Sequence, residues 1–342
     1  MSAPLLVRAC RRERVERTPV WFMRQAGRCL ADYRELRDRF GILEIARTPE
    51  LCARVTAMPV EQLGVDAAVL YADIMLPLDG MGVPFRIEPE VGPIVERPVR
   101  TAQDVDALRV VAAEEATPYL FETIRGLRRT LPADIALVGF AGAPFTLASY
   151  LIEGRPTRDH ALAKAMLFGE PALWDRLMRT LAEVIARYLV AQVRAGADVV
   201  QLFDSWAGSL GPDDYGRAVL PHTLRVFEAL AATGVPRIHF FTGNPELLPL
   251  AARGCDVVSV DWRVSLADAW ARVGADRGLQ GNLDPAACLA PFPLVAERAR
   301  AVLRGAAGRR GHVFNLGHGV LPGTDPETLR RVVALVREET AA

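Results

Sequence analysis

Two arginines near the N-terminus are the first candidates for chemistry. Arg24 ends an apolar run and Arg28 follows four residues later, so in a helix both guanidinium groups lie on one face. Like charges side by side are unfavourable unless an anion joins them, and a guanidinium grips a carboxylate with a fork that an ammonium lacks. We interpret the pair as a carboxylate clamp. The alternative is two structural arginines paired with acidic neighbours such as Asp32 or Glu35.

A carboxylate in an apolar setting is the second candidate. Asp73 ends the apolar run 67–73 and is followed by an Ile-Met-Leu-Pro stretch. Burying an ionised carboxylate costs free energy unless a donor or an opposite charge accompanies it. One reading is that Asp73 accepts N–H bonds from a ligand and stabilises a transient cation. The other is a helix cap or a structural ion pair.

Three further side chains follow other apolar runs. Tyr150 lies in 139–154, which reads as a strand end, a turn of small residues and an apolar helix. Ser205 follows the run 198–204, and His318 lies between two glycines. A histidine between glycines is poorly placed for packing, so it is a candidate for anion binding or proton exchange near neutral pH. The structural alternatives are a core tyrosine with a satisfied hydroxyl and a turn histidine.

Eight short apolar runs position these residues and are interpreted as β-strands. They end in polar residues or glycine and alternate with helix-like stretches, of which two are predicted at 171–195 and at about 326–340. This alternation predicts an α/β fold, either a closed parallel barrel or a doubly wound open sheet. In a barrel, the candidates all fall at the carboxyl ends of the strands, where active sites are built. The expected strands are 20–24, 67–73, 135–141, 198–204, 238–242, 256–261, 278–281 and 312–316.

Composition limits the function classes. The 342 residues contain 41 Lys and Arg and 41 Asp and Glu, so no net field favours nucleic acid or an anionic membrane. Five cysteines without a C-x-x-C pair are typical of a reducing cytoplasm, and neither a secretory signal nor a membrane span is expected. Metal-ligand motifs are absent, as is a G-x-S-x-G elbow around Ser205, so we expect no metal and no serine-nucleophile triad.

Several segments resemble motifs of the uroporphyrinogen decarboxylase family. Residues 19–34, PVWFMRQAGRCLADYR, are similar to the family motif PVWxMRQAGRYLPEYR, and residues 139–154 are similar to GFxGxPxTLAxYxxEG. Cys29 replaces the usual Tyr and Ala31 the usual Pro, which concerns loop shape, and 241–244 looks diverged. Shorter matches follow in family order at 71–74, 201–208, 260–262, 279–285 and 315–319.

The resemblance implies a somewhat distorted (β/α)8 TIM barrel formed by a single domain, 1–342. It also implies a cytoplasmic homodimer without a cofactor. The implied reaction converts the four acetate arms of uroporphyrinogen III to methyl groups, giving coproporphyrinogen III. The implied catalytic residues are Arg24, Asp73, Tyr150 and His318, and the implied substrate contacts are Arg24, Gln25, Ala26, Gly27, Arg28, Arg37, Asp73, Tyr150, Ser205 and His318.

This chemistry needs no metal, because a protonated pyrrole ring is itself an electron sink. Asp73 would accept hydrogen bonds from the inward pyrrole N–H groups, and the arginines would bind peripheral carboxylates. The proton donor stays open between an arginine and His318. Two rival hypotheses are a methyltransferase on a related barrel, which needs zinc bound by His and Cys, and a non-catalytic tetrapyrrole carrier.

Overall fold

A parallel β-sheet curled into a barrel forms the centre of the computed structural model, which describes residues 3–342. Seven strands pair in the order β1-β4-β5-β6-β7-β8-β9, each parallel to the next. Every predicted run from 67–73 onward overlaps one of these strands, so the α/β prediction is confirmed. The strands are β1 (Ala67–Val69), β4 (Ala136–Gly142), β5 (Val199–Asp204), β6 (Arg237–Phe241), β7 (Val257–Ser259), β8 (Gly278–Gln280) and β9 (His312–Val313).

An eighth segment closes the barrel through a single residue, Val20. Val20 forms a parallel bridge with Phe314, just beyond β9, and its carbonyl accepts a 2.8 Å hydrogen bond from the N–H of Asp66, just before β1. The predicted strand 20–24 is therefore correct in position but too long, because the chain turns away at Arg24 with a left-handed φ of 60°. The closed, distorted barrel is confirmed, and the open sheet is wrong.

Asp66 anchors this closure at the amino-terminal end of the barrel. Its carboxylate accepts hydrogen bonds from Arg17 at 2.8 and 2.6 Å, from Arg337 at 3.1 Å and from the N–H of Val20 at 2.8 Å. The Asp66 residue is only 4% exposed. One carboxylate thus holds the N-terminal segment, the start of β1 and the C-terminal helix together.

We expect Asp66→Ala to lower the free energy of unfolding by about 2–4 kcal/mol, because it leaves the buried N–H of Val20 and the Arg17 guanidinium without their acceptor and removes the carboxylate partner of Arg337. Urea denaturation measures this change. Glu339→Ala is the control, since it breaks a 2.8 Å ion pair with Arg300 that lies on the surface, and such pairs contribute about 0–1 kcal/mol. Equal midpoints for both variants would contradict the anchoring role.

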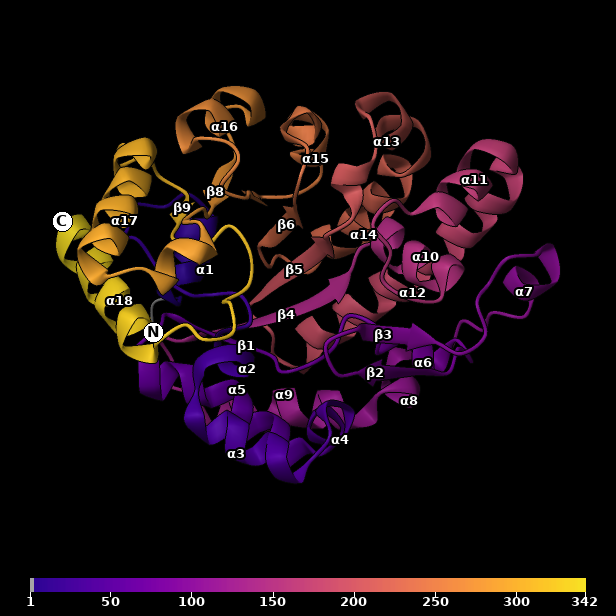
Figure 1. Cartoon of the computed structure of the whole chain (residues 1–342), viewed down its shortest axis with the longest axis horizontal. Helices are drawn as coiled ribbons and strands as arrows, with labels where there is room; N and C mark the ends of the chain where they lie inside the picture. The colour runs from indigo at the N-terminus through magenta and orange to yellow at the C-terminus, as the bar shows by residue number, and fades with distance from the viewer. Residues whose placement is uncertain (1–2) are drawn as a thin grey trace.

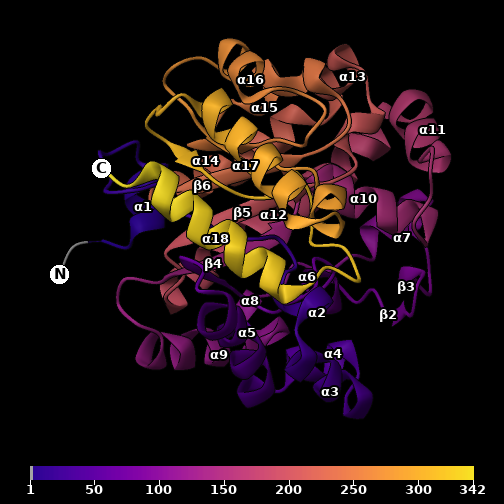
Figure 2. The same cartoon turned by 60° about the vertical axis from the view of Figure 1, so that its left-hand side comes forward.

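Helices cover the outside of the barrel, as Figures 1 and 2 show. Two have the predicted bounds, α12 (Pro171–Ala195) and α18 (Pro326–Thr340). Proline in the first turn starts both, and the Asp325 side chain caps α18 by accepting the N–H of Glu327 at 2.9 Å. The other α-helices are α1 (Leu5–Cys10), α2 (Gln25–Cys29), α3 (Ala31–Arg39), α4 (Ile42–Arg47), α5 (Pro49–Leu63), α6 (Pro77–Gly80), α7 (Ala102–Asp106), α8 (Ala113–Ala116), α9 (Pro118–Thr130), α10 (Pro144–Glu153), α11 (Ala161–Gly169), α13 (Pro212–Ala218), α14 (Leu220–Ala231), α15 (Leu248–Ala251), α16 (Leu266–Val273) and α17 (Phe292–Ala306), and the short 3-10 helices are η1 (Ala207–Ser209), η2 (Pro245–Leu247) and η3 (Pro285–Leu289).

An antiparallel hairpin outside the barrel was not predicted. It consists of β2 (Phe85–Glu88) and β3 (Gly92–Val95), inserted between β1 and β4 (Figure 1). Each strand has four residues, which is too short for a clear alternation of apolar and polar positions. The N–H of Val95 donates to the carbonyl of Gly154 at 2.8 Å, so the hairpin holds the end of α10.

A layer of buried polar side chains crosses the barrel interior near the carboxyl ends of the strands. The Gln280 amide donates to Gln201 Oε1 and to Ser259 Oγ, both at 2.9 Å. Its oxygen accepts the indole N–H of Trp21 at 3.0 Å. These side chains come from β8, β5, β7 and the closing segment, so their hydrogen bonds tie opposite walls together. The result is a cross-linked floor below the mouth of the barrel.

Candidate active site

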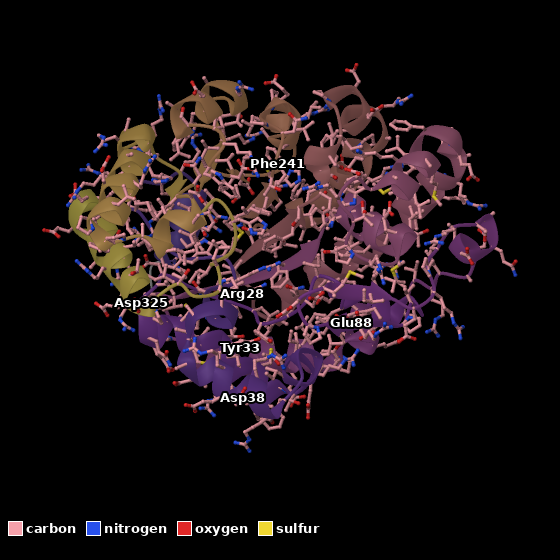
Figure 3. The ribbon with its side chains drawn as sticks, viewed as in Figure 1. Arg28, Tyr33, Asp38, Glu88, Phe241 and Asp325 are labelled. Atoms are coloured by element: carbon pink, nitrogen blue, oxygen red, sulfur yellow. The ribbon has the colours of Figure 1, made fainter. Side chains whose placement is uncertain are left out.

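The candidate residues gather at the mouth of the barrel, at the carboxyl ends of its strands. Arg24 comes four residues after Val20, and Asp73 comes four residues after the end of β1. His318 comes five residues after the end of β9. Figure 3 shows Arg28, on α2, near the middle of the view, whereas Asp38, on α3, lies at the outer edge of the molecule. The placement matches the expectation for a barrel enzyme.

The loop around His318 fits tightly between two neighbours, which explains its glycines. A β-carbon at Gly319 would lie 2.6 Å from Cδ of Arg24, and one at Gly317 would lie 2.7 Å from the backbone nitrogen of Trp262. Side chains at either position would push the loop out of place. The aliphatic stem of Arg24 is therefore packed against the loop, while its guanidinium end remains at the open mouth.

Arg24 and Arg28 have no carboxylate partner in the described part of the chain. Within residues 3–342, neither guanidinium lies within 4.0 Å of an Asp or Glu oxygen. The acidic neighbour Asp32 instead accepts a 2.8 Å hydrogen bond from Gln62. The structural alternative, in which Asp32 or Glu35 neutralises the two arginines, is therefore wrong. Two unpaired cations side by side are the arrangement that an anionic ligand would stabilise.

Asp73 lies close enough to Arg24 for the two charges to interact. One of its carboxylate oxygens accepts the N–H of Met75 at 2.9 Å, which holds the local turn. The other accepts no hydrogen bond from residues 3–342. Burial raises the pKa of the Asp73 carboxyl, while the Met75 N–H and the charge of Arg24 act against this rise. Asp73 thus keeps one oxygen for a ligand beside a positive charge.

Tyr150 completes the same side of the mouth. Burial raises the pKa of its hydroxyl to about 12, and the negative charge of Asp73 contributes to this rise. Its ring centroid lies 6.0 Å from that of Trp206, the residue after Ser205. The aromatic contact therefore links the Asp73 side of the mouth to the end of β5, where Ser205 is half-buried.

His318 is uncharged at neutral pH in the substrate-free protein. Burial lowers the pKa of its imidazole to about 4, and the positive charge of Arg24 lowers it further. Its ring packs edge-on against Phe240, with centroids 5.8 Å apart. Proton exchange near neutral pH, one of the roles considered for this histidine, therefore requires a ligand that adds negative charge nearby.

We expect the His318 imidazole not to titrate between about pH 8 and about pH 5 in the free protein. Nitrogen chemical shifts of labelled histidines, followed by NMR over this range, test the expectation. The His318→Gln variant identifies the resonance by its loss. A midpoint near the ordinary value for histidine would show that the site does not depress this pKa.

The remaining predicted residues are three on α2 and Arg37 on α3. Gln25 is buried, and its side chain accepts the N–H of Phe22 at 2.9 Å and donates to the carbonyl of Ala67 at 3.0 Å. Ala26 is buried and Gly27 is half-buried. Arg37 donates to the carbonyl of Phe40. Its positive charge lies near enough to Tyr71, two residues before Asp73, to act on the Tyr71 hydroxyl.

Two sets of hydrogen bonds at the site were not predicted from the sequence. The hydroxyls of Tyr33 and Tyr71 form a 2.8 Å hydrogen bond that joins α3 to the loop carrying Asp73. Asp204, fully buried beside Ser205, accepts hydrogen bonds from Thr146 at 3.1 Å and Tyr215 at 3.4 Å. Both are contacts between segments distant in the chain, so no local spacing could have indicated them.

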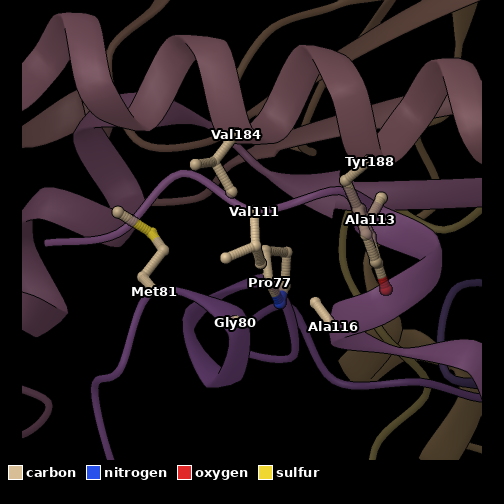
Figure 4. Close-up of a pocket in the computed structure, with 8 residues that line it drawn as sticks. All are labelled: Pro77, Gly80, Met81, Val111, Ala113, Ala116, Val184 and Tyr188. Atoms are coloured by element: carbon tan, nitrogen blue, oxygen red, sulfur yellow. The ribbon is translucent and has the colours of Figure 1, made fainter.

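A small pocket lies behind the Asp73 loop, and Figure 4 shows its lining. Gly80 and Met81 lie on one side of it, and Val184 and Tyr188 on the other. Its volume of about 10 Å³ is near the lower limit for one water molecule. This pocket is therefore too small to be a substrate site.

No three His, Cys, Asp or Glu side chains in 3–342 come together as metal ligands would. Each of the five cysteines is free and buried. No helix in the same residues has the length and apolar character needed to cross a membrane.

Comparison with known proteins identifies the family. The family model described as uroporphyrinogen decarboxylase (URO-D) matches residues 1–339. The chain belongs to this family. A uroporphyrinogen decarboxylase from Streptomyces griseus is 53% identical over 336 residues, covering 98% of this chain and 92% of the relative. One from Thermus thermophilus is 51% identical over 338 residues and covers 98% of both chains.

Solved structures show how widely the fold of the decarboxylase family is shared. A methyltransferase from Methanosarcina mazei superimposes with a TM-score of 0.82 over 99% of both chains, at 22% sequence identity. A B12-independent methionine synthase from Shewanella gives a TM-score of 0.56 at 13% identity, covering 88% of this chain and 90% of that one. At such low identity, these matches bear on the fold alone.

Proposed function

We propose that this member of the family decarboxylates the four acetate arms of uroporphyrinogen III, giving coproporphyrinogen III and four CO2. The observation that supports this most strongly is that Arg24 and Arg28 have no carboxylate partner among residues 3–342, while Arg24 lies near Asp73, one oxygen of which accepts no hydrogen bond from these residues. A ligand suited to this mouth carries carboxylates on its rim and N–H donors at its centre. A cyclic tetrapyrrole with eight carboxylate arms has both.

The pyrrole ring of the substrate provides the electron sink. A proton adds to the ring carbon next to the one that bears the acetate, which makes the ring an iminium-type cation conjugated with the side chain. The bond to the carboxylate then breaks, CO2 leaves, and its electron pair forms an exocyclic double bond. A second proton adds to that methylene carbon, and the first is lost from the ring. The net change replaces each carboxylate with a hydrogen and needs no cofactor.

The residues divide this work between binding and charge stabilisation. Asp73 accepts hydrogen bonds from the inward pyrrole N–H groups and stabilises the ring cation as it forms. Arg24, Arg28 and Arg37 grip peripheral carboxylates, while Tyr150 and Ser205 hydrogen-bond further arms. A bound carboxylate raises the pKa of His318 again, which favours this imidazole over an arginine as the proton donor.

An assay of purified protein with uroporphyrinogen, in the presence and absence of a chelator, tests the proposal. We expect the substrate mass to fall by four CO2 units, with no effect of the chelator. A methyltransferase would contain zinc and lose activity with the chelator, and a carrier would bind the substrate without changing its mass. Unchanged substrate mass overturns the proposal.

A homodimer and a cytoplasmic location follow from the family resemblance as further parts of this proposal. Light scattering of the purified chain measures the oligomeric state, and a monomer at assay concentrations contradicts the first part. Cell fractionation tests the second. The activity assay is independent of both measurements.

A further inference from the structure

The cations described so far lie on one half of the mouth. In the closed ring of eight strand positions, β7 is the fourth neighbour of β1 in either direction, so it lies directly opposite. Arg24 and Arg28 follow the segment next to β1, and Asp73 follows β1 itself. A macrocycle centred on Asp73 extends carboxylate arms towards the opposite half as well. Those arms need a partner near β7.

One basic residue lies directly at the strand ends of the opposite half, among the described residues. Among the first four residues after each of the strands β4 to β8, all within the described chain, Arg263 is the only lysine or arginine. It is the fourth residue after β7, the position that Asp73 holds after β1 and Arg24 holds after Val20. Equivalent positions on a barrel point towards the same mouth.

Two neighbours fix the Arg263 guanidinium in place. Its central carbon stacks on the Trp262 ring, 4.6 Å from the centroid, and its Nη1 donates to Asp261 Oδ2 at 2.5 Å. Two backbone groups hold the Asp261 carboxylate in turn, because it accepts the N–H of Gly243 at 2.8 Å and that of Arg263 at 2.9 Å. The buried carboxylate and the indole thus hold the fork in one orientation before any ligand arrives.

Most donors of Arg263 remain free. A guanidinium has five N–H donors, and Asp261 is the one acceptor that residues 3–342 provide for it. The Arg263 side chain is 48% exposed, whereas that of Asp261 is 4% exposed. A positive charge at Arg263 is also among the causes that lower the pKa of His318, which places it at the same mouth. The exposed edge of the fork is therefore available to a second carboxylate.

We propose that Arg263, stacked on Trp262, binds a carboxylate arm of the tetrapyrrole on the side of the mouth opposite Asp73. This inference rests on the proposed function. Arg263 lies away from the ring cation, so it contributes to substrate affinity rather than to the bond-breaking step. Asp261 is a positioning residue in this scheme, since it acts through the guanidinium.

Kinetics of Arg263→Gln with uroporphyrinogen test the role. We expect KM to rise about tenfold, as for loss of a hydrogen bond to a charged group, with kcat within about threefold of wild type. The denaturation midpoint should stay unchanged. Arg300→Gln is the matched control, since Arg300 is 47% exposed and paired with Glu339 at 2.8 Å on the outer helices; its KM should equal that of wild type.

Arg263→Lys separates binding from a purely structural role. Lysine keeps a positive charge beside Asp261 but lacks the fork. We therefore expect KM to remain several-fold above wild type even when the denaturation midpoint equals that of wild type. The inference is overturned by a wild-type KM in both Arg263 variants, or by changes that only follow a loss of stability. A wild-type protein that fails to decarboxylate uroporphyrinogen counts against the proposed function instead.

Discussion

Asp73→Asn is expected to lower kcat about 100- to 1000-fold, while substrate binding and stability stay close to wild type. Asparagine has the shape of aspartate and still accepts the N–H of Met75, which one Asp73 oxygen accepts at 2.9 Å. It lacks the negative charge that stabilises a protonated pyrrole ring. Single-turnover measurements with uroporphyrinogen, combined with equilibrium binding, separate the lost chemical step from binding.

Asp79→Asn provides the control for this variant. Asp79 lies on α6, six residues beyond Asp73, and its side chain is 25% exposed and paired with Arg47 at 2.6 Å. It is a carboxylate of the same loop region that faces another arginine, so its loss should leave kcat within about twofold. Near-wild-type turnover in Asp73→Asn would remove the central electrostatic role from Asp73.

Arg24→Lys is expected to lower kcat/KM about 10- to 100-fold, although the positive charge is kept. An ammonium is a point charge and cannot form the two parallel bonds of a guanidinium fork. The shorter head also moves away from the mouth, because the stem is held against Gly319. Steady-state kinetics with uroporphyrinogen measure the loss.

Arg39→Lys controls for the general effect of this substitution. Arg39 is an exposed arginine near the end of α3, where its guanidinium lies over the Phe40 ring at 5.4 Å. We expect its kinetics to match those of wild type, since it has no place at the mouth. Full activity of Arg24→Lys would mean that the carboxylate clamp does not depend on the fork.

Helix bounds and strand positions were predictable because their signals are local. α12 begins at Pro171 and ends before Gly196, and α18 begins at Pro326 after the Asp325 cap. Proline in a first turn and a capping carboxylate act within a few residues of one another, so they can be read directly from the chain. The β2–β3 hairpin escaped for the opposite reason, since its pairing partners carry almost no periodic pattern.

The sequence alone did not decide whether the barrel closes. Eight apolar runs suit both a closed barrel and an open sheet. The choice depends on whether the segment at Val20 reaches both Phe314 and Asp66, and those residues are far away in the chain. The role of Asp66 in securing this closure could not be predicted from the sequence, because an aspartate before a strand is common.

The sequence by itself determined which chemical groups stand at the strand ends: arginines after Val20, a carboxylate after β1, and a glycine-flanked histidine after β9. Only the tertiary structure decided which of these groups are already paired. Among the residues that the structure describes, Arg24 and Arg28 have no carboxylate partner whereas Arg263 is paired with Asp261, and the Gln25 side chain turns inward to hydrogen-bond the backbone. The reason is physical, because pairing depends on distances of a few ångström between elements that meet only when the barrel closes.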